Sequence, residues 1–182
     1  MVMRNLLTLC LFSFALPSHA ACPNAPDITA AVDVLLEQVQ SAPNERAARQ
    51  ISNQFWVLWT KAPDEKAQDL LDRGMQAREV FAFDTAAKAF DELVEYCPNY
   101  AEGYNQRAFV NFLQQNYQVA LVDLDLAIAR SPRHVAAIAG KALTLMGLED
   151  DEAAQVVLRE ALALNPWLSE RRFLKEPDGE EL

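Results

Sequence analysis

The stretch AEGYNQRAFVNFLQQNYQVALVDLDLAIARSPRH, residues 101–134, decides the fold because its pattern recurs both before and after it. Its proline and one of its alanines have counterparts 34 residues away on either side, and a bulky apolar residue follows each alanine by four positions. These positions are Pro98, Pro132 and Pro166; Ala86, Ala120 and Ala154; and Phe90, Leu124 and Leu158. Several residue types that keep one period indicate a tandem structural repeat.

The apolar residues inside each unit have helical spacing. Leu121, Leu124 and Ile128 fall on one stripe of a helix, and Pro132 follows that helix, where its missing N–H costs nothing and its ring prevents continuation. A small residue occupies the eighth position of each unit, which allows two helices to approach closely. These small residues are Gly74, Ala108 and Ala142.

On these residues the chain resembles the tetratricopeptide repeat family, whose unit is a helix, a turn and a second antiparallel helix. The units occupy residues 67–100, 101–134 and 135–168, with a large apolar residue at the fourth position of each: Leu70, Tyr104 and Ile138. The resemblance implies an all-α fold, an α-solenoid of three antiparallel helix hairpins. We expect the hairpin turns near residues 81–84, 115–118 and 149–151.

Residues 21–66 predict a further helical pair before the repeats. The first helix starts at a cap formed by Asp27 to Thr29 and runs to about Gln40, and the second runs to about Lys61. Because its turn comes early, we interpret this pair as a capping or degenerate unit rather than a fourth repeat. Residues 169–182 predict a short C-terminal cap and an acidic tail.

Residues 1–20 have the order of charge, apolar run and small residues that is typical of a secretory signal peptide. Arg4 is followed by an apolar run over residues 6–16 and by the small-residue site Ser18-His19-Ala20. The run is too short for a membrane span; the alternative for this segment is a buried first helix. We therefore expect an exported, periplasmic protein with no transmembrane segment in its mature chain.

The acidic balance narrows the partners. The chain has a formal net charge of −10, and loss of Arg4 would make it more negative still. This sign argues against nucleic acid or an anionic membrane surface as partner.

Cysteine usage predicts one disulfide. Removal of residues 1–20 would leave Cys22 and Cys97, an even count in an exported chain. Helix direction supports the pairing, because the second helix of the first repeat should end where the chain begins. The alternative is lipid attachment at Cys22, for which Ala20 and Ala21 fit the usual site and His19 does not.

The residue set of an enzyme is missing from the sequence. Beyond residue 20 the only histidine is His134, best explained as a helix-start or packing residue, and the glycines are scattered. The cysteines lack histidine companions for zinc. The acidic run over residues 149–152 is placed to cap a helix, with weak calcium binding as the alternative. We expect no cofactor, no metal and no catalytic residue.

The resemblance predicts a partner-binding groove on the concave face of the stack. The positions that line this groove in the family are occupied here by Leu71, Met75, Arg78, Asn105, Phe109, Phe112, Leu143 and Met146. Family members that grip a terminal carboxylate use lysine, asparagine and arginine at places where this chain has Leu71, Met75, Gln106, Ala136 and Gly140. We therefore expect an apolar strip without that clamp; the alternative is that these residues are core, or are covered by the chain's own tail or caps.

The resulting hypothesis is a non-enzymatic scaffold or adaptor of the cell envelope that binds a protein or peptide segment. Two alternatives stay open. One is a lipid-anchored assembly factor acylated at Cys22, and the other is an enzyme or small-ligand carrier.

Overall fold

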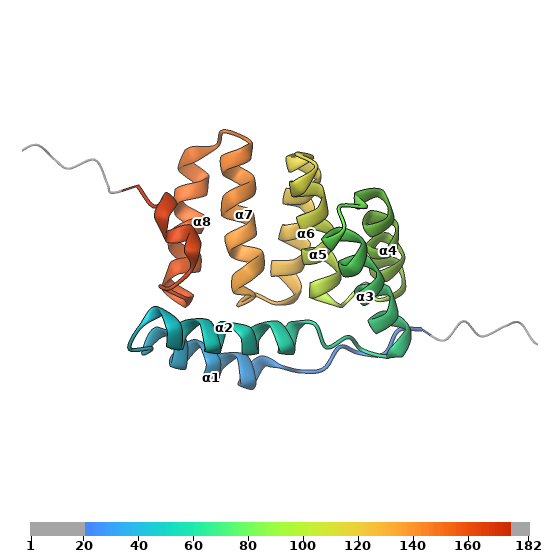
Figure 1. Ribbon diagram of the computed structural model, residues 1–182, viewed down its shortest axis with the longest axis horizontal. Helices are drawn as coiled ribbons and strands as arrows, with labels where there is room; N and C mark the ends of the chain where they lie inside the picture. Colours follow the sequence, from blue (N-terminus) through green and yellow to red (C-terminus); the bar gives the residue numbers. More distant parts are fainter. Residues whose placement is uncertain (1–20, 176–182) are drawn as a thin grey trace, which may run out of the picture.

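The computed structural model describes residues 21–175, so the expected signal peptide and the acidic tail over 176–182 lie outside the described residues. The described part is all-helical, without strands (Figure 1). Its elements are α1 (Thr29–Gln40), α2 (Glu45–Trp59), α3 (Glu65–Glu79), α4 (Phe83–Tyr96), α5 (Ala101–Leu113), α6 (Tyr117–Arg130), α7 (Val135–Gly147), α8 (Asp151–Leu164) and the 3₁₀ helix η1 (Ser169–Phe173). Within residues 21–175, no helix combines the length and the apolar character that a membrane span requires.

Helices α3 to α8 form three antiparallel hairpins stacked side by side, which confirms the predicted fold class (Figure 1). The turns occupy residues 80–82, 114–116 and 148–150, and each begins one residue before its predicted position. The middle residue of each turn has a positive φ of 60° or 62°. The predicted cap role of the acidic run is also confirmed, because Asp150 Oδ1 accepts the N–H of Ala153 at the start of α8.

The repeating alanines are buried where the two helices of a hairpin meet. Ala86, Ala120 and Ala154 are all 0% exposed. The first hairpin packs a larger side chain than the others, because Phe90 stands where the second and third have leucine. Gly74 makes room for it: a Cβ on Gly74 would lie 2.4 Å from Cε1 of Phe90. The first hairpin thus pairs glycine with phenylalanine at the two positions where each of the other hairpins pairs alanine with leucine.

We expect Gly74→Ala to lower the melting temperature, because the added methyl would overlap a ring that is 0% exposed. Such overpacking costs about 1–3 kcal/mol, more than the gain of up to about 1 kcal/mol that alanine brings to a helix. Thermal unfolding followed by circular dichroism measures the effect. The matched control is Gly74→Ala with Phe90→Leu, which recreates the second and third hairpins and should be more stable than Gly74→Ala alone. Equal stability of Gly74→Ala and the unchanged chain would refute this contact.

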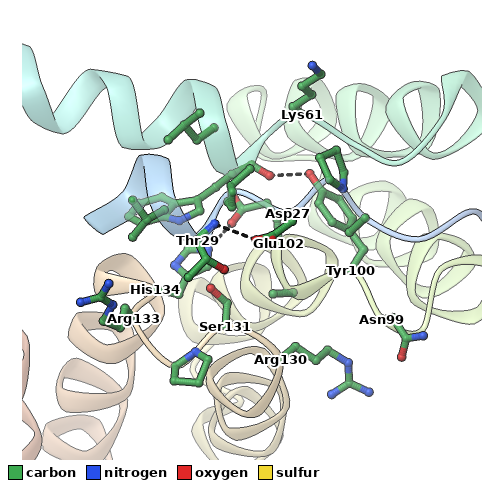
Figure 2. Close-up of a pocket in the computed structure, with 18 of the residues that line it drawn as sticks. Asp27, Thr29, Lys61, Asn99, Tyr100, Glu102, Arg130, Ser131, Arg133 and His134 are labelled. Carbon is green, nitrogen blue, oxygen red and sulfur yellow. Dashed lines mark hydrogen bonds and ion pairs between the residues drawn. The ribbon is translucent and has the colours of Figure 1, made fainter. Parts of the chain in front are cut away.

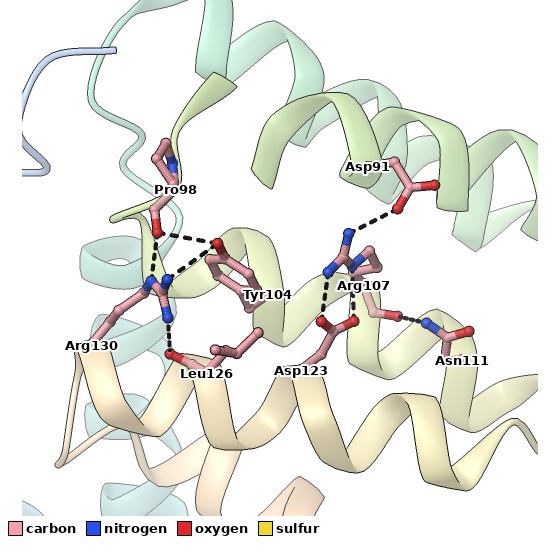
Figure 3. A network of polar contacts seen from close by, with 8 residues as sticks. All are labelled: Asp91, Pro98, Tyr104, Arg107, Asn111, Asp123, Leu126 and Arg130. Atoms are coloured by element: carbon pink, nitrogen blue, oxygen red, sulfur yellow. Dashed lines mark hydrogen bonds and ion pairs between the residues drawn. The ribbon is translucent and has the colours of Figure 1, made fainter. Parts of the chain in front are cut away.

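Figure 3 shows how polar side chains join neighbouring hairpins. Arg107 on α5 binds both carboxylate oxygens of Asp123 on α6, at 2.8 Å from Nε and 2.6 Å from Nη2, and donates from Nη1 to Asp91 on α4 at 2.9 Å. The bidentate bond to Asp123 is the largest influence that raises the pKa of Arg107. Arg130 donates to the carbonyl oxygens of Pro98 and Leu126. The bonds to Asp91 and Pro98 link the second hairpin to the first, and the bonds to Asp123 join α5 to α6 within the second hairpin.

The N-terminal pair has the predicted helices but does not continue the stack. Helices α1 and α2 run crosswise beneath the repeat helices, along the edge that carries the loops between repeats (Figure 1). Their apolar faces form a cluster that includes Val135 of α7, with Leu164, Trp167 and Leu168 packed against it. Gln40 also donates to the carbonyl of Ala163 at 3.0 Å. The pair therefore reaches the third repeat and the C-terminal segment.

The cysteines meet at the other end of this edge. The Cα atoms of Cys22 and Cys97 are 5.1 Å apart, within the usual range for a disulfide. This juxtaposition does not follow from simple alternation of helix direction, because α1 and α2 lie crosswise. It arises because the segment before α1 runs back along the loop edge to the end of α4 (Figure 1). Formation of the bond stays a prediction.

Candidate functional site

A groove of about 320 Å³ opens between the first helices of the second and third repeats. Five of the eight predicted groove residues line it: Arg78, Asn105, Phe109, Phe112 and Leu143. The ring of Phe109 is 43% exposed, and Phe112 and Leu143 are half-buried. Helices α5 and α7 thus supply most of an apolar surface that is accessible from outside.

Three of the predicted residues do not line the groove. Leu71 is 0% exposed and packs with Ala62, Leu70 and Tyr100, so its assignment to an accessible groove is corrected. Met75 packs against the same core cluster, and Met146 is half-buried and absent from the groove lining. The groove is therefore shorter than the family positions predict and lies over the second and third repeats.

Residues outside the repeat helices complete the groove. Trp56 of α2, Leu168 after α8 and Glu170 of η1 all belong to its lining. Trp56 is 42% exposed although it is a large aromatic side chain. No repeat position predicts these contributions, since they depend on how the crosswise pair and the C-terminal segment are placed.

Arg78 is the cation of this groove. Its Nη1 donates to Oε1 of Gln106, and its guanidinium lies 4.9 Å from the centre of the Phe109 ring. No carboxylate of the described residues forms an ion pair with it. Burial lowers the pKa of Arg78, while the negative charges of Glu79 and Glu102 act in the opposite direction. The side chain stays charged at neutral pH and keeps donors free for a ligand.

Comparisons with known proteins agree with this architecture. No protein-family model matches the chain. A tetratricopeptide repeat-containing protein of Rhizobium etli is 27% identical over 143 residues, which are 79% of this chain and 64% of the relative. Tetratricopeptide repeat protein 36 of Xenopus tropicalis is 33% identical over 120 residues, 62% of this chain and 58% of the relative. The three hairpins resemble the tetratricopeptide repeats of these relatives. The chain spans less than two thirds of the length of either relative.

A solved tetratricopeptide domain shows the same fold. The TPR2B domain of yeast Sti1, solved as a complex with an Hsp70 peptide, superposes with a TM-score of 0.57 at 24% identity. The likeness covers 60% of this chain and 90% of the yeast domain. The stack thus has the fold of a tetratricopeptide domain.

A second, larger cavity of about 550 Å³ lies between the tetratricopeptide stack and the crosswise pair (Figure 2). Next to it, Glu102 and His134 form a pair buried to 2% and 1% exposure, with His134 Nε2 at 2.8 Å from Oε2 of Glu102. The other ring nitrogen, Nδ1, accepts the N–H of Ala137 at the start of α7. The ring of Trp59 stacks on His134 with 4.1 Å between centroids. Both nitrogens are occupied, so the helix-start and packing role predicted for His134 is confirmed.

Two further observations concern chemistry. The hydroxyl of Tyr100 donates to the carbonyl of Trp59 at 2.6 Å, and burial, followed by the charge of Glu102, raises the pKa of Tyr100 far above its usual range. This hydroxyl is therefore a neutral structural donor.

In the described part of the chain, no three potential metal ligands lie close enough together to hold an ion.

Proposed function

We propose that this protein is a non-enzymatic interaction module of the cell envelope, whose groove binds a short segment of a partner protein. The observation that carries the proposal is the combination of an accessible apolar groove with a half-buried guanidinium at Arg78 that forms no ion pair within residues 21–175. The proposed location depends on residues 1–20 acting as an export signal.

The groove favours a segment with two kinds of side chain. Apolar residues would cover Phe109, Phe112 and Leu143, where burial of apolar surface supplies the affinity. A carboxylate near them would pair with Arg78 in a site partly shielded from water, where such a bond is stronger than at an open surface. The yeast Sti1 domain, solved as a complex with an Hsp70 peptide, supports peptide binding by a stack of this kind.

The segment should differ from one held by a terminal-carboxylate clamp. At the matching places Leu71 is buried, and Ala136 and Gly140 offer no charge to a ligand. A clamp for a terminal carboxylate cannot form there. We therefore expect recognition of an internal acidic residue flanked by apolar ones.

We expect peptides selected from a random display library to carry this acidic and apolar pattern. Phe109→Ala and Arg78→Gln should each weaken binding of a selected peptide about tenfold, because both remove a central contact. Isothermal titration calorimetry measures the affinities. Phe109→Ala should leave the fold intact, since the side chain is 43% exposed and a buried phenylalanine would cost about 3–5 kcal/mol.

Val122→Ala is the matched control, because Val122 is 59% exposed on α6 and does not line the groove. Its affinity for the peptide should equal that of the unchanged chain. Selected peptides that share no acidic and apolar pattern would contradict the proposed function. So would a loss of affinity in Val122→Ala as large as that in the two groove variants.

A further inference from the structure

The three hairpin turns have the same backbone with different side chains. Phe81, Gln115 and Glu149 are equivalent residues 34 positions apart, with φ of 60°, 62° and 62°. Each donates its N–H to the carbonyl three residues earlier, at 3.0, 2.9 and 3.1 Å. A glutamine or a glutamate closes this turn as well as a phenylalanine does. The turn itself therefore does not require an aromatic residue at position 81.

The first turn exposes apolar surface that the other two do not. Phe81 is 78% exposed and Val80 is 72% exposed, and among the described residues these are the highest values for large apolar side chains. The ring of Phe81 meets Phe83 edge-on with 5.9 Å between centroids, yet it remains largely in solvent. Adjacent exposed apolar side chains that the fold does not need form a candidate interaction site when polar residues rim them.

Acidic residues surround this apolar pair. Glu79 and Asp84 are exposed on either side of it, and neither forms an ion pair within residues 21–175. The third turn, on the same edge of the stack (Figure 1), begins the acidic run over residues 149–152. This sign of charge repels an anionic lipid surface, nucleic acid and a second copy of the same edge. It attracts a cationic partner.

We propose that Val80 and Phe81 anchor a docking site for a basic amphipathic segment of a partner protein. Apolar side chains of that segment cover the two anchors, and its lysines or arginines face Glu79 and Asp84. The site is separate from the groove, because neither Val80 nor Phe81 belongs to the groove lining. A partner can therefore occupy this edge while the groove is empty or filled.

The test uses two synthetic helical peptides of about four turns. Both carry leucines at the spacing of one helix face; the remaining positions are lysine in one peptide and glutamate in the other. Nuclear magnetic resonance of the ¹⁵N-labelled protein locates binding. The lysine peptide should shift the amide signals of residues 79–84, with an affinity that falls as salt increases. Phe81→Gln should weaken it about tenfold.

Phe81→Gln installs the residue of the second turn, so we expect a melting temperature equal to or above that of the unchanged chain. Val122→Gln removes another exposed apolar side chain, on α6, and should leave binding unchanged, as should Phe109→Ala in the groove. Equal binding of the two peptides, or signal shifts confined to the groove, would overturn the proposal. So would a Phe81→Gln variant that binds the lysine peptide with full affinity, or one whose melting temperature is far below that of the unchanged chain. Binding to anionic vesicles, or a dimer that Phe81→Gln dissociates, would assign the edge to a lipid surface or a second copy and overturn it as well.

Discussion

Asp123→Ala is expected to destabilise the protein by about 3 kcal/mol, because it leaves the guanidinium of Arg107 without its bidentate partner. The carboxylate of Asp123 is 3% exposed and the Arg107 side chain is 22% exposed (Figure 3). Water therefore replaces the lost contact poorly. Urea unfolding at neutral pH, followed by circular dichroism, gives the free energy of unfolding.

Asp91→Ala provides the control on the same arginine. Asp91 binds Arg107 at 2.9 Å, but its side chain is 63% exposed, and exposed ion pairs contribute about 0.2–1 kcal/mol. The burial of the carboxylate, rather than the number of ion pairs, should thus decide how much free energy of unfolding each substitution removes. If the two variants lose the same free energy of unfolding, Asp123 does not hold the second hairpin as the structure indicates.

The second large effect concerns the cysteines. We expect Cys97→Ser to lower the free energy of unfolding by about 2–4 kcal/mol, because a bond between residues 75 positions apart restricts the unfolded chain. Non-reduced protein purified from an oxidising compartment should lack two hydrogens by mass and give no reaction with a thiol reagent at Cys22 or Cys97. Reductant should lower the melting temperature of the unchanged chain and leave that of Cys97→Ser unaltered.

Two results would contradict this pairing. Free thiols at both positions would show that the cysteines only lie close together. A lipid adduct on Cys22 would support the membrane-anchored alternative, since an acylated sulfur is unavailable to Cys97. Mass spectrometry of the intact chain and of its tryptic peptides distinguishes these outcomes.

The stack could be predicted because its information is local and repeated. Ala120 is small where helices meet and Pro132 ends a helix, and both properties recur at a fixed spacing. The placement of α1 and α2 could not be predicted in the same way. Val39 indicates an apolar face, but a face at helical spacing does not say whether a preceding repeat or the ends of other helices will cover it.

The groove could be predicted only in part, because the position of a residue in the repeat does not report what surrounds it in space. Phe109 and Leu143 were found because their positions in the repeat face the concave side. Leu71 has such a position too, but it is buried in a core cluster that includes Ala62 and Tyr100, and repeat position does not report such burial. The contact between Glu102 and His134 gave no signal, since the two residues are 32 positions apart and a glutamate is usually found at the surface.

The crosswise pair also has a consequence for binding affinity. A stack of hairpins in which each unit contacts only its neighbours can change its superhelical pitch by small rotations between units. Here one pair of helices contacts the third repeat and the C-terminal segment, while the segment that leads into it reaches the end of the first repeat. Rotation between the units would break contacts at one end or the other. The groove is thus preorganised, and a ligand loses less of its binding free energy to ordering the receptor.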